Sequence, residues 1–151
     1  MSATTTRTPA RLSGLEMMRL VAAGELPAPG IATLLGMELT EVDDGTATFT
    51  LEPDARMLNP LGSVHGGIAA TLLDSAMGCA VHTTLPAGRG YTTAQLNLHY
   101  LRPMLPGMGL VRAVGTVLHR GRRQCTAEGR LLDAEDRLLA HGTTTCLVLD
   151  G

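Results

Sequence analysis

The fold is decided by the stretch 59-NPLGSVHGGIAATLLD-74. Its first four residues include a proline and a glycine, which are turn formers, so the stretch begins as a loop. From Ile68 to Thr84 the chain has no proline and is rich in Ala, Leu and Met, which predicts a helix of about four turns. Gly66 and Gly67 stand between loop and helix, where we expect them to adopt unusual backbone dihedrals and to admit a ligand close to the main chain.

The start of this helix is a candidate oxyanion site. The first N–H groups of a helix have no intrahelical partner and carry the positive end of its dipole, so the N–H of Gly66 could stabilise a negative oxygen. Asp74 lies eight residues further on, roughly 12 Å along the axis, and cannot reach a group held at Gly66 of its own helix. It could reach one held by a second, antiparallel copy across a two-fold axis. The alternative is that Asp74 is an ordinary solvent-facing residue.

The remaining chain alternates between helical and strand patterns. Ser13 and Glu16 match a capping box before a short helix. The other expected helices are Gly14–Ala23 and Ile31–Leu35, and the expected strands are Met37–Val42, Thr46–Leu51, Thr92–Leu101, Leu110–His119, Gln124–Leu132 and Leu138–Leu149. This order predicts an α+β fold, with an antiparallel β-sheet wrapped around one long central helix and an extra N-terminal helix. We expect residues 1–12 to be a flexible tail and residues 13–151 to be a single domain.

Composition argues against several classes of protein. The net charge of −2 and the absence of Trp argue against a nucleic-acid binder. No apolar run approaches the length of a membrane span, so no membrane partner is expected. Three cysteines without metal-type spacing suit a reducing compartment, and we expect a cytoplasmic protein. The five histidines are scattered singly, so neither a metal site nor a cofactor is expected.

The stretch 59–74 resembles a known signature when its parts are taken together. It closely resembles the signature of the PaaI-like hotdog-fold acyl-CoA thioesterases in two parts, Asn59-Pro-Leu-Gly62-x-x-His65-Gly66-Gly67 and 70-ATLLD-74. The resemblance extends to 92-TTAQLNLHYLRP-103 and 118-LHRGR-122 and covers roughly residues 30 to 149. It implies the hotdog fold and makes Asp74 the catalytic carboxylate, either as a general base on water or as a nucleophile that forms an anhydride.

The same resemblance implies roles for four further residues. Gly66 would be the oxyanion donor through its N–H, and His65 would help to position the loop. Asn59 would orient the thioester carbonyl or the attacking water, although an Asn-Pro turn former is the alternative. Thr93 would hold the nucleophilic water. Strict alternation places Thr93 on the opposite strand face from Leu96, so we expect it to point to a subunit interface rather than to the helix.

Coenzyme A, as part of the substrate, would need a binding site of its own. The resemblance implies that the segments 101–106 and 119–124 line the nucleotide site, where arginines could pair with phosphates; ordinary solvated charge is the alternative. The expected contributors are Gly67, Arg102, Pro103, Arg120, Gly121, Arg122 and Arg123. Family members commonly form tetramers as dimers of dimers, so we expect a homo-oligomer that is at least a dimer.

The sequence thus predicts an acyl-CoA thioesterase that hydrolyses a small aromatic (phenylacetyl-type) or medium-chain acyl-CoA to free acid and CoA. Two alternatives stay open. One is an enoyl-thioester hydratase on the same fold, for which only His65 could serve as the catalytic histidine. The other is a non-catalytic acyl-CoA binding module.

Overall fold

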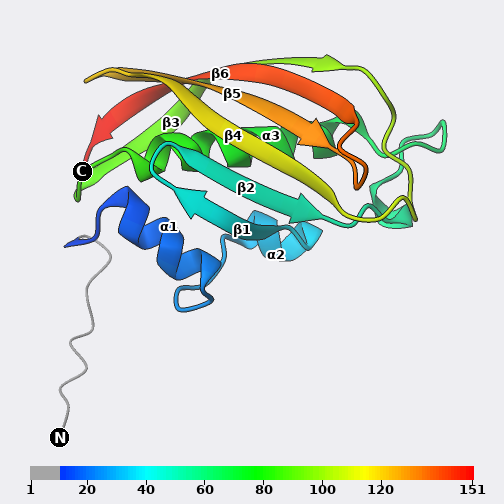
Figure 1. The fold of residues 1–151 in the computed structure, drawn as a ribbon, viewed down its shortest axis with the longest axis horizontal. Helices are drawn as coiled ribbons and strands as arrows, with labels where there is room; N and C mark the ends of the chain where they lie inside the picture. Colours follow the sequence, from blue (N-terminus) through cyan, green and yellow to red (C-terminus); the bar gives the residue numbers. More distant parts are fainter. Residues whose placement is uncertain (1–10) are drawn as a thin grey trace, which may run out of the picture.

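Helix α3, Gly66–Thr83, runs along the concave face of a curved antiparallel sheet in the computed structural model, which describes residues 11–151 (Figure 1). The other elements are α1 Gly14–Ala22, α2 Gly30–Leu35, a 3-10 turn at Ala55–Met57, β1 Glu38–Asp43, β2 Thr46–Leu51, β3 Arg89–Tyr100, β4 Val111–Arg120, β5 Gln124–Leu132 and β6 Leu138–Asp150. The strand order is β1-β2-β4-β5-β6-β3, so β1 and β3 are the edges of the sheet. The predicted α+β hotdog architecture is confirmed.

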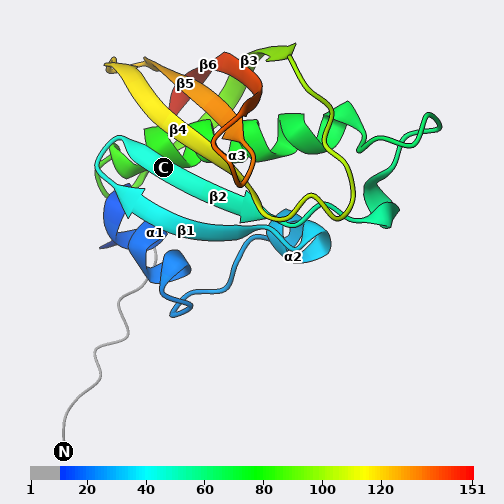
Figure 2. The same ribbon diagram turned by 45° about the vertical axis from the view of Figure 1, so that its right-hand side comes forward.

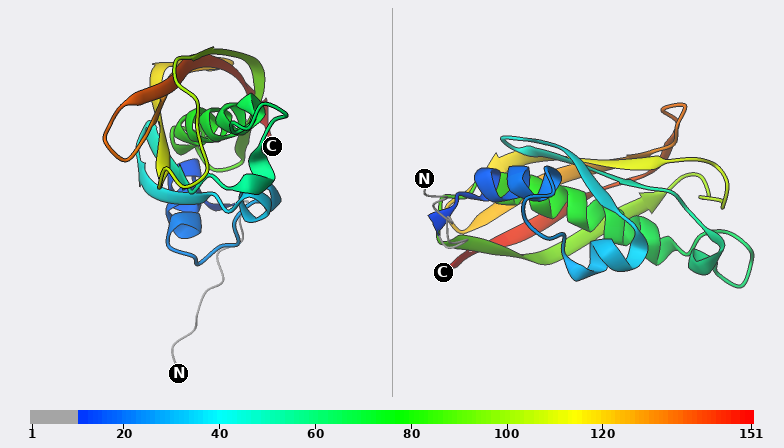
Figure 3. Two further views of the ribbon diagram at one scale, coloured as in Figure 1. Left: turned by 90° about the vertical axis from the view of Figure 1, so that its right-hand side faces the viewer. Right: turned by 90° about the horizontal axis from the view of Figure 1, so that it is seen from below.

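The sheet wraps closely around α3, as the end-on view shows (Figure 3). Leu72, Leu73 and Met77 on α3 are completely buried, so the helix contributes much of the apolar core. Glycines on the facing strands allow this approach: a Cβ at Gly115 would lie 2.3 Å from the carbonyl oxygen of Ala76. The sheet can therefore enclose α3 because its strands carry no side chain at the closest contact.

The N-terminal helices α1 and α2 lie beside β1 (Figure 2). The predicted capping box is confirmed, with the Ser13 side chain bound to the Glu16 N–H and the Glu16 carboxylate bound to the Ser13 N–H. Leu12, the last residue of the expected tail, is only 3% exposed, and two residues later the N–H of Gly14 bonds to the carbonyl of Leu85. Residues 1–10 of the expected tail lie outside the described residues.

Strand β3 departs from simple alternation at one residue. Thr93 pairs with Cys146 and Gln95 pairs with Thr145, so Ala94 is an extra residue that forms a β-bulge. The bulge shifts the phase of the strand, and residues on either side of it that strict alternation would separate come to share a face. Thr93, Leu96, Leu98 and Tyr100 all face α3, opposite Cys146, Thr144, Gly142 and Ala140 of β6. The expectation that Thr93 points away from the helix is therefore wrong.

None of the helices within residues 11–151 combines the length and the apolar character needed to cross a bilayer.

Candidate active site

The first backbone N–H groups of α3 differ in their hydrogen bonding. The Gly67 N–H donates to Nδ1 of His65 at 2.8 Å, and the Ile68 N–H donates to the His65 carbonyl at 2.9 Å. Within residues 11–151, the Gly66 N–H has no hydrogen-bond partner. His65 therefore caps the helix in a way that occupies the neighbouring donors and leaves the Gly66 N–H available for an anion.

Neither of the two glycines is required for its backbone dihedrals, and only Gly67 is limited by size. Neither Gly66 nor Gly67 has a positive φ, and the helix already begins at Gly66, so the expectation of unusual dihedrals is wrong. A Cβ on Gly67 would lie 2.9 Å from Nδ1 of His65, and one on Gly66 would lie 3.4 Å from the ring of Tyr100. A side chain at Gly67 would therefore displace the His65 ring, whereas one at Gly66 would only come into ordinary van der Waals contact with Tyr100.

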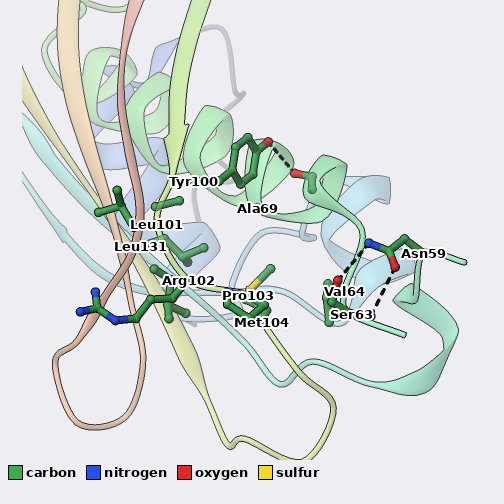
Figure 4. A pocket seen from close by; sticks show the side chains of 13 residues that line it. Asn59, Ser63, Val64, Ala69, Tyr100, Leu101, Arg102, Pro103, Met104 and Leu131 are labelled. Atoms are coloured by element: carbon green, nitrogen blue, oxygen red, sulfur yellow. Dashed lines mark hydrogen bonds between the residues drawn. The ribbon is translucent and has the colours of Figure 1, made fainter. Parts of the chain in front are cut away.

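Asn59 organises the loop before α3. Its Oδ1 accepts from the N–H groups of Leu61 at 2.9 Å and Ser63 at 3.3 Å, and its Nδ2 donates to Oγ of Ser63 at 2.9 Å (Figure 4). This is the turn-forming role considered as the alternative for Asn59. An amide NH2 group carries two hydrogens, so one Nδ2 hydrogen is left for a ligand.

A cavity of about 320 Å³ opens beside this loop and the start of α3 (Figure 4). It brings together Asn59, Gly66, Arg102 and Pro103, four of the predicted site residues. Its other lining residues are Ser63, Val64, Ala69, Tyr100, Leu101, Met104, Leu131, Leu139 and Ala140. The guanidinium of Arg102 donates to the carbonyl of Leu138 at 2.7 Å, which fixes one of its nitrogens at the rim.

Asp74 and Thr93 form a second cluster, two turns along α3. The Thr93 hydroxyl donates to Oδ1 of Asp74 at 2.8 Å, and both residues are half-buried. No residue from 11 to 151 bonds to Oδ2 of Asp74, so that oxygen can take a proton from water. The cluster lies against β3, an edge strand of the sheet.

Tyr91 and Cys79 lie near this carboxylate, and the sequence pattern indicated no functional role for either of them. Burial raises the pKa of the Cys79 thiol to about 12, and the nearby negative charge of Asp74 adds to this effect. Burial likewise raises the pKa of Tyr91. A Cβ at Gly78 would lie 2.6 Å from the Tyr91 hydroxyl, so the tyrosine occupies the space that a side chain would need there. Cys79 is therefore a neutral packing residue at physiological pH, not a nucleophile.

The turn between β4 and β5 lies at the other end of α3 (Figure 1), and it carries the remaining predicted arginines. Arg120, Gly121 and Arg122 line a cavity of about 310 Å³ together with Thr84 and Leu85, just beyond the helix end. Arg120 is already paired with Asp44 at 2.9 Å. Neither Arg122 nor Arg123 has an acidic partner within residues 11–151. In one chain the predicted arginines thus form two groups, separated by the roughly 27 Å length of an 18-residue helix.

Across residues 11–151 there is no group of three or more His, Cys, Asp or Glu side chains arranged to hold a metal ion.

A curved antiparallel sheet wrapped around one long helix is the hotdog fold. The model of the thioesterase superfamily matches residues 61–140, and the chain belongs to this family as a PaaI-like thioester hydrolase.

One curated relative and two solved structures are similar to this chain. The chain is 30% identical over 115 residues to the proofreading thioesterase EntH of Cronobacter turicensis, a match covering 74% of this chain and 82% of EntH. The structure of E. coli PaaI, from the phenylacetic acid degradation operon, superposes with a TM-score of 0.81 at 23% identity, covering 92% and 98% of the chains. A phenylacetic acid degradation-related protein from Ralstonia eutropha superposes with a TM-score of 0.78 at 33% identity, covering 86% and 98%.

Proposed function

We propose that this protein hydrolyses a small aromatic, phenylacetyl-type, or medium-chain acyl-CoA to free acid and CoA, in a site shared by two copies of the chain. The unpaired Gly66 N–H carries the proposal, because it is a fixed donor at a helix start beside a cavity. Asp74 supplies the carboxylate. The two lie eight residues apart on one helix, roughly 12 Å, so the Asp74 that acts belongs to the second copy.

The reaction follows from the charges that these groups stabilise. The thioester carbonyl oxygen lies at the Gly66 N–H, which stabilises the negative charge that develops as the carbonyl carbon is attacked. Asp74 either removes a proton from the attacking water or attacks directly and forms an anhydride that water then cleaves. The C–S bond breaks and the sulfur leaves as CoA thiolate. The hydroxyl hydrogen of Thr93 is used in the bond to Asp74. The Thr93 hydroxyl can therefore interact with the water only by accepting a hydrogen bond at its oxygen.

The edge strand β3 is the proposed contact between the two copies. It has 12 residues and lies at the sheet edge beside Asp74, so an antiparallel strand of a second chain would complete its hydrogen bonds. We propose a dimer built in this way, with a dimer of dimers as the full assembly. The cytoplasm is the proposed location.

The two-fold arrangement also accounts for the two groups of arginines. Antiparallel helices bring the end of one α3 toward the start of the other, so Arg122 and Arg123 of one copy approach the cavity with Arg102 and Pro103 of the other. Arg122 and Arg123 are the better phosphate ligands, because Arg120 would have to give up Asp44.

The hydratase alternative is disfavoured by the state of His65. Its Nδ1 accepts a hydrogen bond from the Gly67 N–H at 2.8 Å, so in the neutral ring the proton is on Nε2. The ring thus serves as the cap of α3. With Nδ1 occupied, a neutral ring presents only a donor at Nε2 and cannot take a proton from a substrate there.

The first test measures thiol release from a panel of aromatic and aliphatic acyl-CoAs, with wild type and Asp74→Asn in parallel. We expect Asp74→Asn to lose about 10²–10⁴-fold in kcat, as for a missing general base, with CoA binding kept. No release from any thioester, with CoA still bound, would indicate a binding module instead.

A second test asks whether the site is shared. Gly66→Pro removes the donor N–H at the first helical position, where proline is well tolerated. Co-expression of Gly66→Pro and Asp74→Asn chains with different tags yields mixed dimers, each with one intact site. We expect random pairing to restore about one quarter of wild-type activity. A site within a single chain would give no restoration.

A further inference from the structure

We propose that Tyr100 is a positioning residue that, together with His65, clamps the peptide following the oxyanion donor; this inference rests on the proposed function. The Tyr100 hydroxyl donates to the carbonyl oxygen of Gly66 at 2.8 Å (Figure 4). The N–H of the same peptide unit, which belongs to Gly67, donates to Nδ1 of His65 at 2.8 Å. Both polar atoms of the Gly66–Gly67 peptide are thus held by side chains from outside the helix.

The clamp matters because two successive glycines have the freest backbone in the chain. The Gly66 N–H can preorganise an oxyanion only if the dihedrals of Gly66 are fixed before the substrate arrives. Holding the next peptide at its oxygen and at its nitrogen fixes those dihedrals from one side. The Ile68 N–H bonds to the His65 carbonyl, which holds the preceding peptide on the other side. The donor therefore lies between two restrained peptide planes.

Tyr100 is placed for this task by packing as well as by its hydroxyl. Its ring covers Gly66, where a Cβ would lie 3.4 Å from the ring carbons, and it lines the cavity that contains Asn59 and Arg102. Tyr100 is 54% exposed, so the hydroxyl could be satisfied by water and the fold has little need of the bond. A carbonyl oxygen has two lone pairs, so the bond is made in addition to the helix's own hydrogen bond.

The test compares wild type with Tyr100→Phe, which removes only the hydroxyl, on the best thioester of the panel. We expect kcat to fall about 3- to 10-fold, the equivalent of one hydrogen bond, while KM stays within about two-fold and the thermal midpoint is unchanged. Asn97→Ala, exposed on the opposite face of β3, is the matched control and keeps wild-type rates. A Tyr100→Phe protein with wild-type kcat, or with its loss confined to KM, would overturn the proposal.

Two further measurements separate the clamp from a general effect. In a double-mutant cycle with His65→Ala, the double variant should lose less than the product of the single losses, since the peptide is held only when both residues are present and losing either one already releases it. Independent, multiplicative losses would contradict a shared clamp. Amide hydrogen exchange of Gly67, followed by NMR, should be at least about three-fold faster in Tyr100→Phe, with Ala80 in mid-helix as the unchanged reference.

The exchange measurement does not depend on turnover. If wild type hydrolyses no thioester, the proposed function fails, yet Gly67 exchange still decides whether Tyr100 restrains the helix start. Unchanged Gly67 exchange would overturn the clamp whatever the rates show.

Discussion

Thr93 on β3 donates a hydrogen bond of 2.8 Å to Oδ1 of Asp74 on α3. The bond joins an edge strand to the central helix and orients the carboxylate, so that Oδ2 is the oxygen left for water. A hydrogen bond to a charged group is stronger than one between neutral groups. The position of this threonine therefore determines how the proposed base faces its substrate.

We expect Thr93→Val, which keeps the side-chain shape but loses the hydroxyl, to lower kcat about 10-fold or more. That loss corresponds to the about 1.5–3 kcal/mol that a hydrogen bond to a charged group contributes. Thr93→Ser keeps the hydroxyl and is the matched control, with most of the activity retained. Steady-state thiol release measures both, and a Val variant as fast as wild type would show that Asp74 is oriented by other contacts.

The bulge at Ala94 marks the limit of what the sequence could predict in this region. Period-2 alternation correctly gives the strand but allows only one of Thr93 and Tyr100 to face the helix. The extra residue lets both do so, Thr93 toward Asp74 and Tyr100 toward Gly66. Nothing in the local pattern signals a bulge, because it is defined by the pairing with β6 rather than by the residues of β3.

Other features were predictable because their causes are local. The capping box at Ser13 follows from side-chain reach over one helical turn, and the loop and helix around His65 follow from turn formers and apolar content. The pairing of Arg120 with Asp44 was not predictable, since it joins residues 76 positions apart through the sheet. Local sequence patterns thus predicted the helices, the strands and the candidate residues. Side-chain partners on different strands could be identified only from the structure.

Gly115 lies where the sheet contacts the backbone of α3, and a larger residue there should destabilise the fold. A Cβ there would lie 2.3 Å from the Ala76 carbonyl oxygen, which is backbone and cannot rotate away. We expect Gly115→Ala to lower the free energy of unfolding by about 3 kcal/mol, measured by urea denaturation. Gly30 at the start of α2 is the matched control, since its φ is not positive and nothing lies within 4 Å of a Cβ. Gly30→Ala should be neutral or stabilising by up to about 1 kcal/mol, and equal losses in both variants would contradict this account.

His82 gives the fold a specific pH dependence. Burial lowers the pKa of its ring, which packs against Tyr91 with ring centroids 5.6 Å apart. The unfolded chain therefore binds a proton at higher pH than the folded one does, and stability is lost as the pH falls below about 6.5 toward the lowered value. We expect His82→Gln to flatten the change in urea midpoint between pH 7.5 and pH 5.5. An identical pH dependence in wild type and variant would show that His82 does not contribute to it.

We expect the three cysteine thiols to be unreactive in the folded protein. Cys125 and Cys146 are about 1% exposed or less, and burial raises the pKa of Cys146 and brings that of Cys79 to about 12. At pH 8 the thiolate fraction of Cys79 is then roughly 10³-fold smaller than that of an ordinary cysteine. We expect a chromogenic aryl disulfide to react negligibly with the folded chain over a thioesterase assay, and with three thiols per chain in guanidinium. One native thiol that reacts as fast as free cysteine would show that the interior around Asp74 opens readily, because the thiolate can form only when water reaches it.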